Sequence, residues 1–364
     1  MEPFFILLQK LLPFLFILTL LVFVHEFGHY ISALRHGVKI EIFSIGFGPE
    51  IFGFTDKRGT RWKFSLIPLG GYVKMFGDTE ESSSLPKKEL FLISESSKKE
   101  SFFFKPVWQK IEIAFAGPLS NYIFAILILS LIFSTVGQPR WSNEPIIGAV
   151  LSGSLAEKSG FFEEDFILSV NGAPVKNFQE IGLLISKETN FLHFLVQRSS
   201  NNVLNEIHIF FEKNNFFISL GVMRSQGLVI CDFFTSFFEA IKYSFSLSFD
   251  MLQGIWKMIT GQISTKGLSG PLGIAQISGN IVQHKDWVGI FSFIALLSIN
   301  LGLINLLPIP MLDGGHLLFY FLELLKGKPL NEKIRLFSFR IGFLIVIMLF
   351  IYITINDLLR LFES

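Results

Sequence analysis

Four long apolar stretches constrain the fold of this chain more than any other feature of its sequence. An α-helix needs about 20 predominantly apolar residues to cross the hydrocarbon core of a bilayer. Stretches of that length run approximately over residues 4–30, 111–136, 288–307 and 341–359. Together with a mean hydropathy of +0.52 for the whole chain, they predict a polytopic α-helical membrane protein with about four transmembrane helices.

The distribution of lysine and arginine predicts how these helices are oriented. The loop at 31–110 carries 13 of these residues and the loop at 326–340 carries five, whereas the N-terminal MEPFF carries none. Lysine and arginine accumulate in cytoplasmic loops of membrane proteins. We therefore expect both loops in the cytoplasm, and the N-terminus, the long middle segment and the C-terminus on the opposite side.

The first cytoplasmic loop, residues 37–110, contains two different kinds of sequence. The segment RWKFSLIPLGGYVKMFG is rich in β-favouring residues, which predicts extended structure with a turn at Gly70 and Gly71. Residues 78–101 are rich in serine, lysine and glutamate, a composition typical of a flexible, solvated insert.

The middle of the chain contains a soluble and an amphipathic segment. In residues 145–221, short β-type runs alternate with glycine, serine and asparagine, which predicts a small extracytoplasmic β-rich domain. Residues 228–262 are apolar but contain five charged residues, so we expect an interfacial amphipathic helix that lies on the membrane. The expected segments are 1–36, 37–110, 111–136, 145–221, 228–262, 288–316 and 341–360.

Charge and cysteine content exclude several kinds of site. The formal net charge is +1, so the chain as a whole has no electrostatic footprint for nucleic acid, and we expect no nucleic-acid partner. Cys231 is the only cysteine of the chain, which excludes an intrachain disulfide and a cysteine-based zinc site.

The motif HEFGH at residues 25–29 carries the clearest chemical signal. On a helix, His25 and His29 point to the same side and can bind one Zn²⁺, and Glu26 can reach an activated water as general base. The motif lies in the first apolar stretch, where each ionisable residue costs about 2.5–3.5 kcal/mol. A bound dication would compensate that cost; the alternative is that these polar residues pair with one another at a helix end.

A catalytic zinc ion normally has three protein ligands, so a third must come from elsewhere. Asp313 in NLLPIPMLDGGH, residues 305–316, is the best candidate, because Pro308 and Pro310 interrupt the helix and the following glycines permit a sharp turn. His316 is the alternative ligand, and Asp313 could instead cap the next helix. The predicted orientation puts HEFGH and this motif at the same, cytoplasmic depth.

His36 is not expected to be a ligand, although it shares a helix face with His29. On a continuous helix it would lie about 10 Å further along, too far to share an ion. Gly37 follows it and is a typical residue for ending a helix. We therefore expect His36 at the helix C-terminus, where the helix dipole favours it.

Several motifs along nearly the whole chain resemble the site-2 protease family of intramembrane zinc metalloproteases. They are HEFGH, FAGPLSN at 115–121 and NLLPIPMLDGGH. GFGP at 46–49, GGYVKMFGD at 70–78, LSGPLGIA at 268–275 and the wider LLSINLGLINLLPIPMLDGGHLLF at 296–319 are most similar to the bacterial RseP-like members, which act in regulated intramembrane proteolysis. The resemblance implies a protease of the bacterial inner membrane.

The resemblance also implies residue roles. His25, His29 and Asp313 would bind zinc, Glu26 would be the catalytic base, and Asn305 would assist at the substrate or transition state. Because a substrate helix must unwind before cleavage, we also expect an edge strand, Gly70, Gly71, Tyr72 and Val73, to bind it; the alternative is a surface hairpin. Expected substrates are single-pass membrane proteins, such as anti-sigma factors or remnant signal peptides.

Residues 145–221, with GSLAEKSG and SVNGAPV, resemble a PDZ domain. The chain has room for one such domain, and the Gly-Asp that usually precedes the hydrophobic strand is Glu164-Asp165. Two other classes remain as alternatives: a catalytically silent membrane adaptor, which would have no use for Glu26, and a metal-ion transporter, which would need more polar residues along its spans.

Overall fold

The computed structural model describes residues 2–78, 94–186, 191–199, 203–210, 220–263 and 270–363. The chain forms two compact units, which we treat separately. The first combines residues 1–132 with 234–364, and the second comprises residues 133–233. Most of the predicted flexible insert, residues 79–93, lies outside the described residues, as do residues 268 and 269 of the LSGPLGIA motif.

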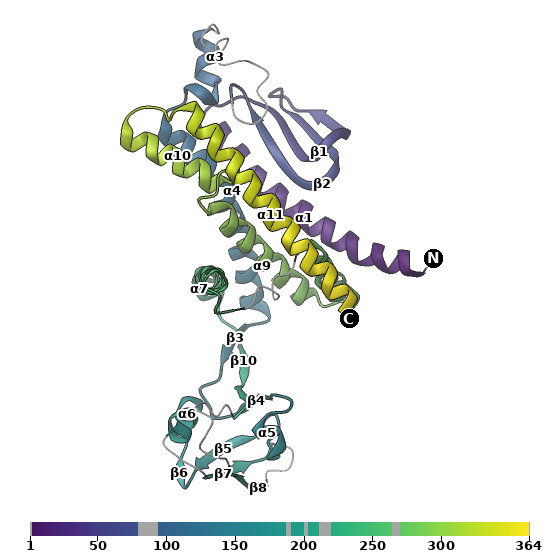
Figure 1. Cartoon of the computed structure of the whole chain (residues 1–364), viewed down its shortest axis with the longest axis vertical. Helices are drawn as coiled ribbons and strands as arrows, with labels where there is room; N and C mark the ends of the chain where they lie inside the picture. The colour runs from purple at the N-terminus through teal and green to yellow at the C-terminus, as the bar shows by residue number, and fades with distance from the viewer. Residues whose placement is uncertain are drawn as a thin grey trace. The chain divides into compact units, whose positions relative to one another are not determined.

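Long apolar helices dominate the first unit (Figure 1). They are α1 (Glu2–Arg35), α4 (Val107–Thr135), α9 (Trp287–Leu306) and α11 (Glu332–Glu363). Within the described residues, four helical segments are long and apolar enough to cross a membrane: 11–35, 107–135, 287–306 and 333–359. The prediction of a helical membrane protein with about four such helices is confirmed.

Small residues allow α1, α4 and α9 to approach closely. A side chain at Gly28 of α1 would collide with Ala116 and Ser120 of α4. On α9, a Cβ at Gly302 would lie 3.0 Å from the Tyr122 ring and 3.1 Å from the Pro118 carbonyl oxygen. Small residues at such crossings are the usual means by which apolar helices gain van der Waals contact in lipid.

Two bent antiparallel strands, β1 (Ile40–Thr55) and β2 (Arg61–Met75), follow α1. The two strands are joined at Asp56–Thr60. The predicted turn at Gly70 and Gly71 lies inside β2, where the chain reverses direction: residues 61–64 run alongside the first half of β1 in its own direction, and residues 71–75 run against it. The carboxylate of Asp56 accepts hydrogen bonds from the backbone N–H groups of Arg58 and Thr60, which fixes the turn between the strands. Burial raises the pKa of Asp56, but these bonds and one from Trp62 lower it below its ordinary value.

The pairing register shows that both halves of β2 lie alongside β1, so the two strands form a sheet that is more than two segments wide. Phe43 of β1 pairs with Trp62 in the first half of β2 and with Val73 in the second half. Phe43 is buried and stacks on Trp62, with 4.3 Å between the ring centroids. The segment that includes Gly71 and Val73 therefore forms one edge of the sheet, and no further described strand pairs with it.

Shorter elements complete the first unit. They are α3 (Glu95–Glu100), the 3₁₀ turn η1 (Phe102–Phe104), α7 (Phe233–Ile259), α8 (Pro271–Gln283) and α10 (Asp313–Lys326). Residues 228 and 229 of the expected amphipathic segment belong to a strand, and the helix α7 begins at Phe233. One face of α7 carries buried small residues, and Ser248 on this face forms a 2.7 Å hydrogen bond with Tyr122 of α4.

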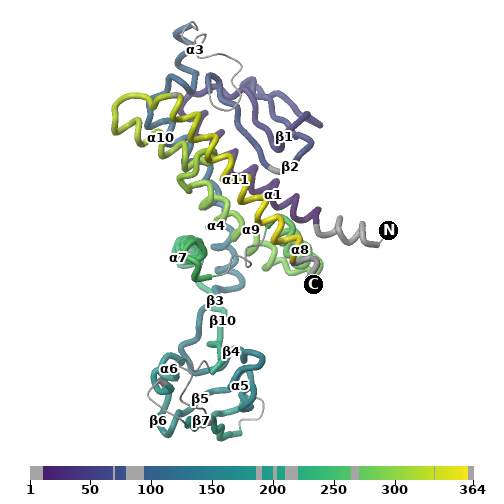
Figure 2. Tube along the Cα trace, viewed as in Figure 1, coloured from purple at the N-terminus to yellow at the C-terminus, as the bar shows by residue number. Residues whose placement is uncertain are grey.

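Helix α8 was not anticipated from the sequence. It packs against α1 and against α11, near the C-terminal end of α11 (Figure 2). The buried carboxylate of Asp357 on α11 accepts hydrogen bonds from the backbone N–H groups of Gly270, Leu272 and Gly273, at 2.9, 3.1 and 3.0 Å. A side chain from another helix thus satisfies the first N–H groups of α8.

The second unit is rich in β-structure, as predicted. Its main sheet has the antiparallel order β6 (Ala173–Pro174), β5 (Phe166–Val170), β7 (Phe191–Gln197) and β8 (Leu204–Phe210). Two strand pairs, β3 (Gln138–Trp141) with β10 (Gln226–Val229) and β4 (Ile147–Val150) with β9 (Val222–Arg224), and two helices, α5 (Leu155–Lys158) and α6 (Phe178–Ser186), complete it. Alternate residues of β7, including Leu192 and Phe194, lie in the hydrophobic core of the second unit.

Candidate metal centre

Two imidazoles and one carboxylate from distant parts of the sequence converge in the first unit. Nε2 of His25 lies 3.3 Å from Nε2 of His29 and 3.1 Å from Oδ2 of Asp313. Nε2 of His29 lies 3.4 Å from Oδ1 of Asp313. Ligands at about 2.0–2.1 Å from a tetrahedral zinc ion are separated by about 3.3 Å. The spacing between the two imidazole nitrogens, and that of each nitrogen from one oxygen of the Asp313 carboxylate, are therefore close to the value for one such ion.

The environment of Asp313 supports the same conclusion. Its Oδ2 atom is shielded from solvent and accepts no hydrogen bond from any described residue, although the His25 ring nitrogen is close. The three side chains are only 11, 12 and 20% exposed. A buried carboxylate oxygen without a hydrogen bond is costly, and a cation would satisfy it. Two imidazoles and one carboxylate are a donor set that suits zinc.

The interruption between α9 and α10 positions Asp313. Helix α9 ends at Leu306, and α10 begins at Asp313, so the break predicted from Pro308 and Pro310 is present. A Cβ at Gly314 would collide with the carbonyl oxygens at the end of α9, and one at Gly315 would lie 2.5 Å from the Ile309 carbonyl oxygen. These glycines therefore allow α10 to start directly beside the end of α9.

Contacts from α4 orient the histidine rings. The backbone carbonyl of Ile113 accepts a 2.8 Å hydrogen bond from Nδ1–H of His29, which leaves Nε2 available for a metal. On His25, Nδ1 faces the side-chain amide of Asn121 at 3.2 Å, and Asn121 is fully buried. A side chain at Gly117 would collide with the His29 ring and would lie 2.9 Å from Cε1 of His25.

Gly117 and Asn121 were not assigned roles from the sequence. Both belong to FAGPLSN, the motif at 115–121. The signal that could have identified them is their i, i+4 spacing, which puts them on one face of α4. Only the structure shows that this face is the one against the histidines.

Of the other residues expected at the site, Asn305 and Gly71 lie beside residues of the HEFGH motif. The Asn305 side-chain nitrogen is 3.4 Å from Nε2 of His25. A Cβ at Gly71 would lie 2.9 Å from Cγ of Glu26, so the edge of β2 runs beside that glutamate. Tyr72 stacks on Phe47, with 6.2 Å between ring centroids, and Val73 packs against the core beneath the sheet. At Gly70, with a φ of 150°, a side chain would collide with the Phe47 ring.

Neither His36, which was not expected to bind metal, nor His316, the alternative ligand, is part of the described cluster. Nε2 of His36 forms a 2.7 Å hydrogen bond with the carboxylate of Glu112 on α4, and Gly37, with a φ of 66°, ends α1 as expected. His316 packs against Phe339 and Tyr320, with centroid distances of 5.3 and 6.3 Å. The ligand group found among the described residues contains Asp313 and not His316.

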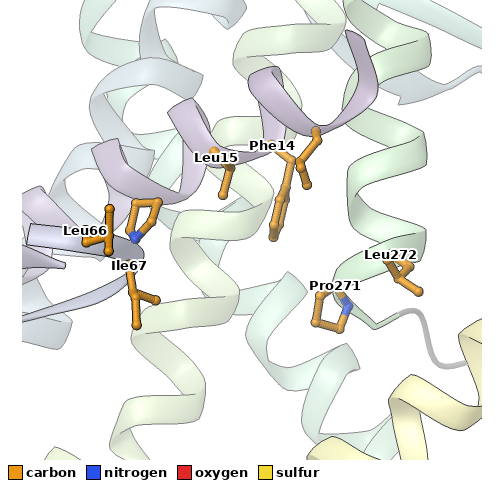
Figure 3. A pocket seen from close by; sticks show the side chains of 8 residues that line it. Phe14, Leu15, Leu66, Ile67, Pro271 and Leu272 are labelled. Atoms are coloured by element: carbon orange, nitrogen blue, oxygen red, sulfur yellow. The ribbon is translucent and has the colours of Figure 1, made fainter. Parts of the chain in front are cut away.

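An apolar cavity lies apart from the ligands, between the N-terminal half of α1, β2 and the start of α8 (Figure 3). Its lining consists of Leu11, Phe14, Leu15, Leu66, Ile67, Pro68, Pro271 and Leu272. Leu66, Ile67 and Pro68 directly precede the segment of β2 that passes Glu26. The strand therefore connects the cavity with the metal centre.

Comparison with known proteins agrees with this site. The model of peptidase family M50 matches residues 13–349. The chain belongs to peptidase family M50. This M50 chain is a zinc metalloprotease, its cofactor is zinc, and its family acts on membrane proteins.

Full-length relatives support the assignment. A Rhizobium meliloti protein provisionally named a zinc metalloprotease is 35% identical over 370 residues, which cover 98% of both chains. A Brucella suis protein with the same provisional name is 37% identical over 374 residues, or 97% of this M50 chain and 96% of the relative. Metalloprotease MmpA of Caulobacter vibrioides is 33% identical over 386 residues, with 97 and 96% covered.

Proposed function

We propose that this M50 protease cleaves peptide bonds within or beside the membrane-embedded segments of single-pass membrane proteins. The observation that carries the proposal is the tetrahedral spacing of His25, His29 and Asp313, two of which lie on an apolar helix long enough to span a bilayer. Ionisable side chains at such a position are expensive unless they bind or transfer charge.

Each residue at the centre has a distinct role in this proposal. His25, His29 and Asp313 would hold the zinc ion, which would supply Lewis-acid chemistry for the scissile carbonyl and the attacking water. Glu26 would take the proton from the attacking water and pass it to the departing amide nitrogen. Asn305 donates a hydrogen bond from its amide to the substrate carbonyl or to the negative charge that develops there.

The edge of β2 holds the substrate. A transmembrane helix hides its peptide bonds in internal hydrogen bonds, and strand addition at Gly70–Val73 would hold the unwound segment instead. Gly71 supports this role, because its lack of a side chain lets β2 pass directly beside Glu26. The apolar cavity at Leu66–Pro68 would accept apolar side chains of the substrate before it reaches the strand edge.

The experiment is cleavage of a model transmembrane substrate by purified protein, with zinc content measured on the same samples. Glu26→Gln removes a base but no ligand, so cleavage should fall by about 10²–10⁴-fold while zinc content stays unchanged. Glu112→Gln, which changes a carboxylate outside the metal-ligand group, is the matched control and should cleave normally. Near-normal cleavage by Glu26→Gln would refute the proposal.

The proposed location is the bacterial inner membrane, with the metal centre toward the cytoplasm and the second unit outside. The lysine and arginine distribution supports this orientation. In a Cys231→Ser background, an impermeant thiol reagent added to intact spheroplasts should label Lys176→Cys and not Lys57→Cys. The reverse labelling pattern would invert the orientation.

The second unit, we propose, is a PDZ-like domain that restricts which substrates reach the protease. Remnants left by an earlier cleavage, such as trimmed anti-sigma factors or signal peptides, would pass it. Deleting residues 145–221 should then permit cleavage of untrimmed substrates and leave trimmed substrates cleaved at the same rate. A loss confined to trimmed substrates would instead indicate recruitment.

A further inference from the structure

A second group of side chains of the types that bind metal ions, two histidines and one glutamate, lies in the second unit. His193 is on β7, and Glu206 and His208 are on the neighbouring edge strand β8. In the antiparallel register, His193 pairs directly with His208, and Glu206 is two residues before His208. Because side chains alternate along a strand, all three emerge from the same face of the sheet.

The three side chains are close enough to share an ion. Oε2 of Glu206 lies 3.5 Å from Nε2 of His193 and 3.9 Å from Nε2 of His208. The group has one potential ligand atom per residue, all within 4.8 Å of one another. These spacings exceed the roughly 3.3 Å between ligands of a tetrahedral zinc ion, so an ion would have to draw the side chains together by rotation about their side-chain bonds.

One atom of the group is unsatisfied. Nε2 of His193 is shielded from solvent and makes no hydrogen bond with any described residue. A buried nitrogen that makes no hydrogen bond is costly. A metal ion in front of Glu206 would give this nitrogen a partner and would also neutralise the carboxylate.

The surrounding contacts hold the group in place. The His208 ring stacks on the His193 ring at a centroid distance of 4.7 Å and on Phe191 at 5.8 Å. The His193 backbone N–H donates to Oδ1 of Asn171 at 2.6 Å. The opposite face of both strands is in the core, so slipping the register by one residue would expose that core. The register that creates the group is therefore fixed by packing.

We propose that His193, Glu206 and His208 bind a divalent transition-metal ion of the zinc, copper or nickel class. Two imidazoles with one carboxylate favour such ions over calcium or magnesium, which prefer oxygen ligands. The cavity in front of the group, lined also by Asn171 and Phe191, is open and leaves room for water to complete the coordination. The ion would cross-link the edge strand β8 to β7 in a unit that has no disulfide.

The experiment is zinc titration of chelator-stripped, full-length protein in detergent. Wild type should bind one zinc ion at the protease centre and a second, weaker one at this group. His208→Gln should lose the weaker ion and keep the stronger, whereas His25→Gln should lose the stronger and keep the weaker. His284→Gln, which changes an exposed histidine at the end of α8, is the control and should bind both.

Hydrogen exchange gives a second measurement that distinguishes binding from misfolding. Zinc should slow amide exchange in β7 and β8 of His25→Gln, and this protection should disappear when His208→Gln is added. Absence of a second ion in wild type, or its retention with unchanged affinity in His208→Gln, would overturn the proposal. Neither result depends on proteolysis, so the proposed protease function stands or falls separately.

Discussion

The side-chain amide of Asn121 lies 3.2 Å from Nδ1 of His25, on the opposite side of the imidazole from the candidate metal position. The amide oxygen of Asn121 is buried and accepts no hydrogen bond from any described residue. When Nε2 of a histidine binds a metal, Nδ1 carries the proton and needs an acceptor. With the amide turned by half a turn, its oxygen would face Nδ1 and both groups would be satisfied. We therefore expect Asn121 to favour the His25 tautomer that binds metal.

Replacing Asn121 should weaken zinc binding. Asn121→Leu removes the acceptor for Nδ1 of His25, and the loss of such a partner typically costs about 10–100-fold in metal affinity. Asn121→Asp retains an acceptor and is the matched control, so its affinity should stay near wild type or rise. The measurement is the rate of zinc transfer to a chelator. Equal rates for Asn121→Leu and wild type would remove Asn121 from the account.

We expect Asp357 to stabilise the fold, because its carboxylate holds the start of α8. Asp357→Leu leaves three N–H groups at the start of α8 without their acceptor, and each unsatisfied group costs about 1–3 kcal/mol. Thermal unfolding in detergent should show a large loss. Asp286, the exposed N-cap of α9, accepts from Gly289, and Asp286→Ala should cost only about 1 kcal/mol. Similar losses for the two variants would contradict this assignment.

Glu164 has a φ of 66°, a left-handed conformation that glycine adopts without strain. Glu164→Gly should relieve about 1 kcal/mol of strain, partly offset by the entropy of the more flexible unfolded chain. Glu164→Val should destabilise the second unit by about 1–3 kcal/mol, because a β-branched residue fits this conformation poorly. Denaturant unfolding of the two variants tests the difference. Equal stability would show that the strain is absent.

The sequence predicted features that depend on local pattern. Long apolar runs identified the spanning helices, and the prolines before Asp313 identified the helix break. The turn at Asp56–Thr60 was not predicted. The glycines where β2 reverses direction also allow close approach: Gly71 passes Glu26, and Gly70 faces the Phe47 ring.

Other features depend on partners distant in the sequence. Helix α8 is held by a carboxylate about 85 residues later, and such a partner has no local signature. The contact of Asn121 with His25 spans 96 residues, so the spacing within α4 alone could not reveal it. His193 and His208 become neighbours only through the strand register. Metal-binding groups built across strands or helices therefore require the fold.

The ligand set of the protease centre is tested most directly by X-ray absorption at the zinc edge of the purified protein. The account predicts nitrogen and oxygen scatterers at about 2.0–2.1 Å, with the multiple scattering of two imidazoles. Experiments should use a His208→Gln background so that only this centre is loaded. Asp313→Asn should then lower the zinc content sharply, because a neutral amide is a poor zinc ligand. Full zinc content with an unchanged spectrum in Asp313→Asn would contradict the assigned centre.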